Sequence, residues 1–462
     1  MTQCRRESIQ NPSSSPFATR IEARLEKPLT PEEIFSIQSQ RETRLSRLLT
    51  LYITTGLIFM LLPGTFLGVW NLISISNRQT ALSVSPSWIQ AHGHAQIFGW
   101  VGTFILGIGF YSIPKLRRME PFGLFICSLC WALWTAGVTL RWLANVYLWH
   151  WRVLVPLSAG MELIAFAMFF RAVSGHKPAS GNSGKAQFEP WVLVVVAGTL
   201  GFMGMLLANA AATVYFAIFG NSPAFPTEFD QRYLVLSAWG FMVPFVWGFS
   251  AKWLPIFLGL RTTRTRLLLC STAINAVGVA AALCGAFHVA TVILLVGAML
   301  TGFALRLFEG TRQPPKTKSV YASYPIFVRI AYVWLTIAAV LGIWAAQTGS
   351  PGVWGASRHA LTVGFIATMV FCVGQRVLPA FSGMRLLFSP RLMGAGLLLL
   401  TVGCTLRVSS EILAYQGYSP AAWKWLPVSA LIELTAVTLF AFNMLATFAR
   451  KPAPQRLETI RA

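Results

Sequence analysis

Two histidines in this sequence stand at the head of similar hydrophobic runs. His94 precedes Pro114 by 20 positions in HAQIFGWVGTFILGIGFYSIP, and His359 precedes Pro379 by 20 positions in HALTVGFIATMVFCVGQRVLP. On an α-helix, which rises about 1.5 Å per residue, that separation covers roughly 30 Å, the thickness of the hydrocarbon core of a bilayer. We therefore expect two membrane helices that carry a histidine at the same depth.

Such a pair of histidines could bind a metal. Imidazole at the N-terminal end of a helix feels the positive end of the helix dipole, which favours the neutral ring that a metal needs. Two imidazoles inside a bundle rich in aromatic residues and glycine are typical of haem held by two axial ligands. His94 and His359 are the expected axial pair, and a purely structural role for them is the alternative.

His92 lies two positions before His94. On a helix the two side chains point about 200° apart, so they cannot both bind one metal without local unwinding. Only His94 matches the repeated pattern, which makes His92 the alternative ligand. His92 could instead support the site, bind something else or lie at the membrane interface. For His150 and His288 a structural role is expected.

Two arginines follow the histidines at similar intervals. Arg141 ends TAGVTLR, 47 positions after His94, and Arg407 ends TVGCTLR, 48 positions after His359. Haem carries propionates, and both arginines are placed to form charge-assisted pairs with them. The alternative is that both side chains extend to the membrane headgroups.

A carboxylate follows each arginine inside a hydrophobic run. Glu162 stands six positions after a proline in PLSAGMEL, and Glu433 stands six positions after a proline in PVSALIEL. An ionisable group inside a membrane span is costly and usually faces a partner or a cavity. We expect Glu162 and Glu433 to be equivalent intramembrane carboxylates.

Twelve membrane-spanning helices are predicted to position these residues. Charge-poor runs long enough to cross a bilayer begin near residues 48, 88, 121, 153, 190, 232, 267, 289, 325, 358, 392 and 425. The shared motifs make spans 1 to 4 and 9 to 12 copies of one four-helix unit. Spans 5 to 8 form a degenerate copy with Val235 in place of the histidine, 20 positions before Pro255. The expected fold is an all-α membrane protein of three pseudo-repeated four-helix units.

The same pattern predicts the domain boundaries. We expect a basic cytoplasmic tail at 1–47, repeat 1 at 48–172, repeat 2 at 188–310, repeat 3 at 322–448 and a cytoplasmic tail at 449–462. The first of these tails lacks the apolar run of a signal peptide.

Composition supports a membrane protein. Hydrophobic residues make up 55% of the chain and charged residues 11%, whereas soluble domains carry about 25% charged residues. The net charge of +22 could suggest nucleic acid, but alternating spans place 30 of the 37 Lys and Arg on one side. The positive-inside rule then puts both termini in the cytoplasm and excludes nucleic acid as a partner. The seven cysteines show no framework spacing.

The two histidine runs resemble the NnrS family of haem- and copper-containing bacterial proteins with twelve spans. The resemblance rests on HxHAQIFG with Pro114, and on RHALTVGFIATMVF followed by Gln375, Arg376 and Val377. It covers nearly all of 48–448 and is specific at the histidine runs. The family is distantly similar to subunit I of the haem-copper oxidases, whose three four-helix units carry key histidines on helices 2, 6 and 10. The resemblance implies that fold, a bacterial inner-membrane location and a role in tolerance of nitric oxide.

The sequence also departs from the family pattern. The family often reads HEMLFG where this chain has HAQIFG after its first histidines, and often has a further histidine where this chain has Phe381. Both losses put copper in doubt more than haem. Reducing oxygen in the haem-copper manner takes about six membrane histidines, and span 6 offers Val235 instead. We do not expect an oxygen reductase.

The resulting hypothesis is a b-type haem protein that acts in nitric oxide tolerance or in associated electron transfer. Its expected partners are the lipid bilayer and either nitric oxide or a redox partner. A membrane transporter or a metal or haem assembly factor on a related scaffold is the alternative. Three repeats favour the haem protein, because transporters more often use paired repeats.

Overall fold

The computed structural model describes residues 31–116, 122–175, 189–383 and 385–450, and every regular element in these ranges is helical. The chain divides into two compact units, 1–45 and 46–462. The arrangement described below is that of the second unit. Most of the predicted tails, residues 1–30 and 451–462, lie outside the described residues.

Twelve helices in the described ranges are long and apolar enough to cross a membrane, as expected of a multi-pass membrane protein. Spans 1 to 4 are α2 (Pro31–Phe59) continued by η1 (Met60–Phe66) and α3 (Leu67–Arg78), α4 (Pro86–His94) continued by η3 (Ala95–Gly102) and α5 (Thr103–Leu116), α6 (Leu124–Tyr147), and α7 (Trp151–Gly175). Spans 5 to 8 are α8 (Pro190–Phe219), α9 (Thr227–Val235) continued by η4 (Leu236–Met242) and α10 (Val243–Leu258), α11 (Thr265–Leu283), and α12 (Phe287–Ala304). Spans 9 to 12 are α13 (Tyr324–Thr348), α14 (Pro351–His359) continued by η5 (Ala360–Ala367) and α15 (Thr368–Phe381), α16 (Pro390–Tyr415), and α17 (Ala422–Ala449). A short 3-10 helix, η2 (Ala81–Ser83), joins the first two spans.

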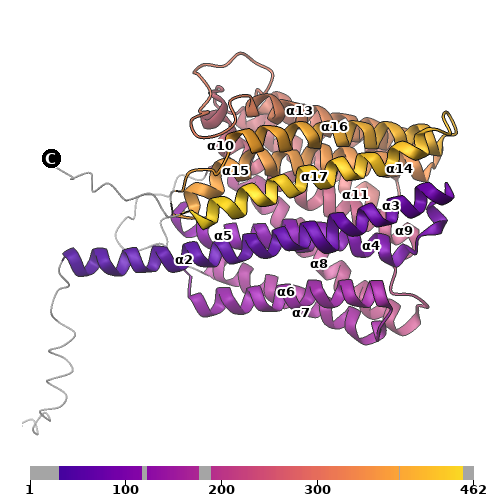
Figure 1. Cartoon of the computed structure of the whole chain (residues 1–462), viewed down its shortest axis with the longest axis horizontal. Coiled ribbons are helices and arrows are strands. Elements are labelled where there is room, and N and C mark those ends of the chain that lie inside the picture. The colour runs from indigo at the N-terminus through magenta and orange to yellow at the C-terminus, as the bar shows by residue number, and fades with distance from the viewer. Residues whose placement is uncertain (1–30, 117–121, 176–188, 384, 451–462) are drawn as a thin grey trace, which may run out of the picture. The chain divides into compact units, whose positions relative to one another are not determined.

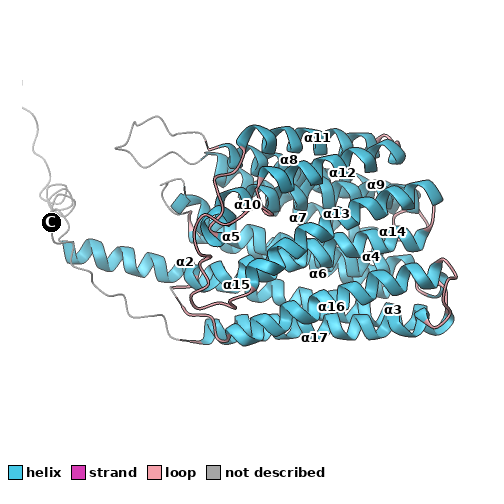
Figure 2. Ribbon diagram, turned by 90° about the horizontal axis from the view of Figure 1, so that it is seen from above, coloured by secondary structure: helices cyan, strands magenta, loops and turns pink. Residues whose placement is uncertain are grey.

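The spans run side by side (Figure 1), and span 1 lies against span 12. Both views place α3 next to α17 (Figure 2). The hydroxyl of Ser76 donates to the carbonyl oxygen of Trp423 at 2.6 Å, and an apolar cluster around Leu72 and Leu426 fills the same junction. Repeats 1 and 3 are therefore neighbours in space although they are far apart in sequence.

Two glycines show that repeats 1 and 3 are built alike. A β-carbon on Gly137 of α6 would lie 2.9 Å from Cγ of Glu162, and one on Gly403 of α16 would lie 2.7 Å from Cγ of Glu433. In both repeats, therefore, the third span approaches the fourth at the intramembrane carboxylate. The expected fold of three pseudo-repeated four-helix units is confirmed.

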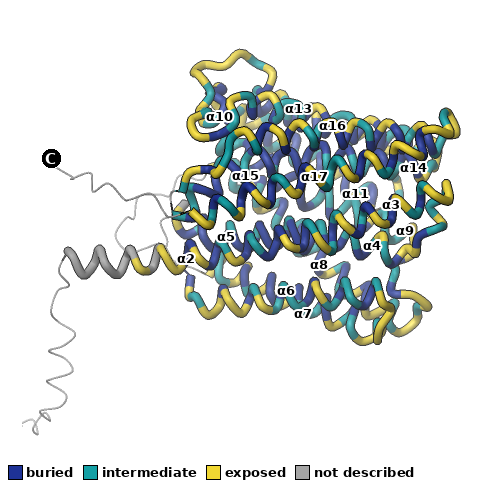
Figure 3. The backbone as a smooth tube through the Cα atoms, viewed as in Figure 1, coloured by how far each residue is buried: buried dark blue, intermediate teal, exposed yellow. Residues whose placement is uncertain are grey.

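Spans 2, 6 and 10 share a departure from regular α-helix. Each contains a π-helical segment, and these segments begin at Ala95, Leu236 and Ala360, directly after His94, Val235 and His359. Spans 2 and 10 also lie deep in the bundle, with 78% and 67% of their most apolar stretch buried (Figure 3). Since π segments are rare and often mark functional sites, these three positions are candidate functional sites.

Spans 6 and 10 begin earlier than the hydropathy pattern predicts. They were expected near residues 232 and 358, but α9 begins at Thr227 and α14 at Pro351. The first turns of both helices contain polar or small residues, in TEFDQ and PGVWGAS. Gly352 and Val353 of α14 are buried, whereas Thr227 and Glu228 of α9 are exposed. Both helices therefore continue through polar or small residues beyond the apolar stretch that a bilayer requires.

Candidate functional sites between the repeats

His94 lies at the interface between repeats 1 and 2, called here interface 1–2. Its Nε2 is 2.7 Å from Oε1 of Glu162, and the two side chains are 7% and 0% exposed. Nδ2 of Asn209, on α8 of repeat 2, donates to the other oxygen of Glu162 at 3.3 Å. The ring of His94 stacks on Phe98 with a centroid distance of 4.1 Å. His94 is thus engaged with a buried carboxylate through Nε2.

Arg141 lies at the same interface. It is 2% exposed and within electrostatic range of Glu162 and Tyr233. Its Nε and Nη1 have no hydrogen-bond partner among the described residues, and neither do the hydroxyl of Tyr233 and the side-chain amide of Asn145. The guanidinium carbon lies 4.9 Å from the centre of the Phe225 ring. The arginine is therefore inside the protein and not at the headgroups.

His359 lies at the interface between repeats 3 and 1, called interface 3–1. Its Nδ1 is 2.9 Å from the carbonyl oxygen of Gly355 and 3.2 Å from Oε2 of Glu411. Nη2 of Arg407 donates to its Nε2 at 3.4 Å. Nε of Arg407 is 3.6 Å from the same carboxylate oxygen of Glu411, an ion pair without hydrogen-bond geometry. Glu433 is within electrostatic range of all three side chains.

His92 belongs to interface 3–1 as well. Its Nδ1 lies 2.9 Å from the carbonyl oxygen of Gly64, and its ring packs on Gly68, where a β-carbon would come within 2.6 Å of Cε1. His359 and Arg407 are within electrostatic range of His92. The structure thus brings His92 toward His359, while the contacts of His94 lie toward repeat 2.

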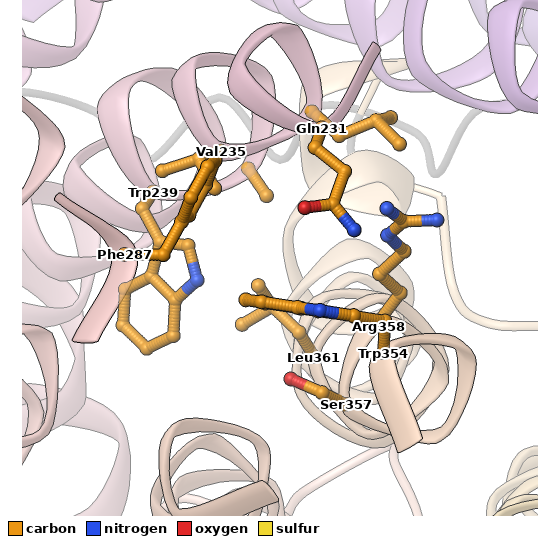
Figure 4. Close-up of a pocket in the computed structure, with 10 residues that line it drawn as sticks. Gln231, Val235, Trp239, Phe287, Trp354, Ser357, Arg358 and Leu361 are labelled. Atoms are coloured by element: carbon orange, nitrogen blue, oxygen red, sulfur yellow. The ribbon is translucent and has the colours of Figure 1, made fainter. Parts of the chain in front are cut away.

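The interface between repeats 2 and 3, called interface 2–3, holds a pocket of about 40 Å³ (Figure 4). Val235, at the position of the missing histidine, lines it together with Trp239 from span 6. Trp354, Ser357 and Arg358 line it from span 10. This interface is mostly apolar, with polar groups along one side.

Three-fold pseudosymmetry explains why the equivalent histidines do not face each other. Equivalent residues of repeats related by such a rotation point to different interfaces. This agrees with the link from His94 through Glu162 to Asn209 of repeat 2, and with the electrostatic proximity of His359 to His92 of repeat 1. Two histidines that meet across one interface must therefore come from non-equivalent positions. His92 is the candidate partner of His359 across interface 3–1. Tyr233 and Ser357, which occupy the position of His92 in repeats 2 and 3, lie at interfaces 1–2 and 2–3.

The sequence-based reasoning missed Asn145, Glu411 and Tyr233. Asn145 and Glu411 each follow an arginine of the repeated motif by four positions, so one helical turn places them on the same face as that arginine. Extending the motif alignment by four residues would have found them. Tyr233 is the counterpart of His92, two positions before Val235.

Two comparisons give the chain a place among known proteins. Residues 321–449, which cover spans 9 to 12, match a family described as a domain of unknown function, DUF8744. No curated protein sequence is significantly similar to the chain. The fold is similar to a solved structure described as a heme-copper terminal oxidase dimer, with a TM-score of 0.53 and 10% identity over 88% of this chain and 85% of that chain. The chain therefore has a haem-copper oxidase-like membrane fold.

Proposed function

We propose that this chain is a haem-binding membrane protein with His92 and His359 as the axial ligands at interface 3–1. The proposal rests on one contact made by each ring. Nδ1 of His92 lies 2.9 Å from the carbonyl oxygen of Gly64, and Nδ1 of His359 lies 2.9 Å from that of Gly355. Such a contact places the proton on Nδ1 and leaves Nε2 for a metal, as in most metal-bound histidines. His92 and His359 come from spans 2 and 10 of different repeats, so the two rings would hold a haem between repeats 1 and 3.

The surroundings of this pair suit a group that carries both iron and carboxylates. Arg407 donates to Nε2 of His359, the nitrogen that iron would take, and its own Nη1 is buried without an acceptor among the described residues. When His359 binds iron, Arg407 can turn to a propionate. The carboxylate of Glu411 beside Nδ1 makes His359 a more basic ligand.

His94 fits this role less well than the sequence suggested. Its Nε2 already contacts Glu162, and its ring lies at interface 1–2. We therefore assign the axial position in span 2 to His92, and His94 holds Glu162 in place.

Haem would supply one-electron chemistry to this site. Two axial imidazoles leave iron no open position, which favours electron transfer over direct ligand binding. Together with the resemblance of the histidine runs to the NnrS family, this supports a role in electron transfer linked to nitric oxide tolerance, with a b-type haem in a bacterial inner membrane and the termini in the cytoplasm. We do not propose copper or oxygen reduction; haem-dependent oxygen uptake by the purified protein would contradict this.

Absorption spectra of native protein purified from haem-replete cells, with a pyridine haemochrome assay for haem type and content, test the proposal. We expect bound haem with a low-spin bis-imidazole spectrum in the wild type. His92→Ala and His359→Ala should each abolish that spectrum, whereas His94→Ala, His150→Ala and His288→Ala should retain it. A colourless but folded wild type would refute haem binding. Loss of the spectrum in His94→Ala with retention in His92→Ala would return the axial role to His94.

A further inference from the structure

Arg141 and Arg407 occupy equivalent positions but differ in how their charge is balanced. Arg407 has Glu411 four positions later on α16, with 3.6 Å between Nε and the carboxylate. The equivalent residue four positions after Arg141 is Asn145, which is neutral and 0% exposed. No carboxylate of the described residues lies within ion-pair distance of Arg141.

The acidic side chains near Arg141 are occupied elsewhere. Both oxygens of Glu162 have partners, His94 at 2.7 Å and Asn209 at 3.3 Å. Asp230 is within electrostatic range of both Arg141 and Arg358 of span 10. Burying a guanidinium without a hydrogen-bonded acceptor is costly, so an anion bound directly at Nε and Nη1 of Arg141 would be stabilised.

Several unpartnered hydrogen-bonding groups surround this arginine. Nε and Nη1 of Arg141, the amide of Asn145 and the hydroxyl of Tyr233 are all buried without a partner among the described residues. Asn145 lies one helical turn from Arg141, and Tyr233 is within electrostatic range of it. Two buried nitrogens of the guanidinium thus lack an acceptor among the described residues, and two further donor groups, the amide of Asn145 and the hydroxyl of Tyr233, come from repeats 1 and 2.

A clamped side chain covers the cluster. The ring of Phe225 lies over the guanidinium of Arg141, and the backbone of Phe225 is held by Gln90. Nε2 of Gln90 donates to the carbonyl oxygen of Phe225 at 2.9 Å, and the amide N–H of Phe225 donates to Oε1 of Gln90 at 2.8 Å. These two hydrogen bonds therefore fix the loop before α9, which carries Phe225, to α4 across interface 1–2.

We propose that interface 1–2 is a binding site for a small monovalent anion, with Arg141 as its counter-charge and Asn145 and Tyr233 as further donors. The ligand is a compact group with several acceptor lone pairs, such as nitrate or a halide, because the cluster offers donors from several directions and is closed by Phe225. A carboxylate of a larger group would use the same chemistry. The proposal does not depend on haem at interface 3–1.

Thermal unfolding in detergent, with nitrate replacing the bulky anion gluconate at constant ionic strength, measures binding. A ligand that binds only the folded state raises the unfolding temperature with its concentration. We expect saturable stabilisation of the wild type by nitrate. Asn145→Asp supplies the carboxylate that Glu411 supplies at interface 3–1, and should weaken the apparent nitrate affinity at least about tenfold while the protein stays folded. Arg141→Gln should have the same effect, and the exposed-charge control Arg78→Gln should not.

The site is located by anomalous diffraction from crystals grown in bromide. A bromide ion beside Arg141 in the wild type, lost in Asn145→Asp, would support the proposal. Equal nitrate stabilisation in wild type and Asn145→Asp, or ordered water beside Arg141 in the bromide crystals, would overturn it. Haem content is measured on the same samples: if it falls together with nitrate binding in Asn145→Asp, the anion at Arg141 is a haem carboxylate and the free-anion site is refuted.

Discussion

Gly201 and Gly240 lie backbone to backbone where spans 5 and 6 cross: a β-carbon on Gly201 would stand 1.9 Å from the carbonyl oxygen of Gly240. Gly240 lies in the π segment of span 6, five positions after Val235. In repeats 1 and 3 the corresponding glycines, Gly99 and Gly364, instead meet the side chains of Phe59 and Trp334. In repeat 2 the backbones of the first two spans are thus in direct contact at this crossing.

We predict that Gly201→Ala destabilises the protein by about 3 kcal/mol, because neither backbone can move aside without disturbing its helix. Gly204 lies on the same helix, and a β-carbon there would meet nothing within 4 Å. Gly204→Ala should therefore be neutral or slightly stabilising. Chemical or thermal unfolding of both variants in detergent checks this, and equal stability would show that the two spans separate easily.

Breaking the buried contact between His94 and Glu162 should be costly. We expect His94→Phe and Glu162→Leu each to lower the free energy of unfolding by about 3–5 kcal/mol, because each leaves a buried polar partner alone. The double variant should lose less than the sum of the two, since only the longer contact from Asn209 is then left without a partner. Additive losses in a double-mutant cycle would mean that the contact does not couple the two residues.

Arg407→Ala should lower the reduction potential of bound haem. A positive charge close to haem stabilises the reduced state, which carries one positive charge fewer, so its removal favours the oxidised state. Arg141→Ala should shift the potential less, because Arg141 lies at interface 1–2. Potentiometric titration of both variants tests this, and equal shifts would place the haem near both arginines.

The contact between Glu189 and Lys252 should make stability depend on pH. Hydrogen bonds from Lys252, at 2.5 Å, and from Trp191 lower the pKa of Glu189 below its usual value of 4.5. A carboxylate with a lowered pKa stabilises the fold above its unfolded-state pKa, and this contribution is lost as the pH falls through the folded-state pKa. Lys252→Gln should therefore be less stable than wild type at pH 7, with the difference vanishing in acid.

The size of that difference is limited by solvent. The side chain of Glu189 is 48% exposed, so the loss should stay below about 1 kcal/mol. Unfolding temperatures of both proteins at neutral and acidic pH give the comparison. A difference that grows in acid would show that Lys252 acts through packing and not through its charge.

The sequence could predict the spans and the repeats, because these depend on hydrophobic length and on motif spacing. The residues PLSAGMEL and PVSALIEL were enough to pair Glu162 with Glu433, and their glycine neighbours confirm the equivalence. The expected boundaries failed where a helix continues through polar or small residues beyond its apolar stretch, as at Thr227 and Pro351.

The partner of each histidine could not be predicted in the same way. The sequence showed that His92 and His94 point in different directions, but not which of them faces His359. That choice depends on how span 2 is rotated about its axis and on the order of the repeats around the bundle. Histidines that are paired by their position in the repeat are equivalent residues. Three-fold pseudosymmetry places equivalent residues at different interfaces, so this rule does not identify residues that meet.

His92 and His94 share one nine-residue helix, α4, so interfaces 3–1 and 1–2 are mechanically linked. A rotation of α4 that adjusts His92 to a change of charge at His359 must also alter the distance from His94 to Glu162. The helix would then transmit the redox state of one interface to the hydrogen bonding of the other. Infrared difference spectra should show this as a shift of the Glu162 carboxylate band on reduction, absent in Glu162→Gln, and an unchanged band would mean that the two interfaces act independently.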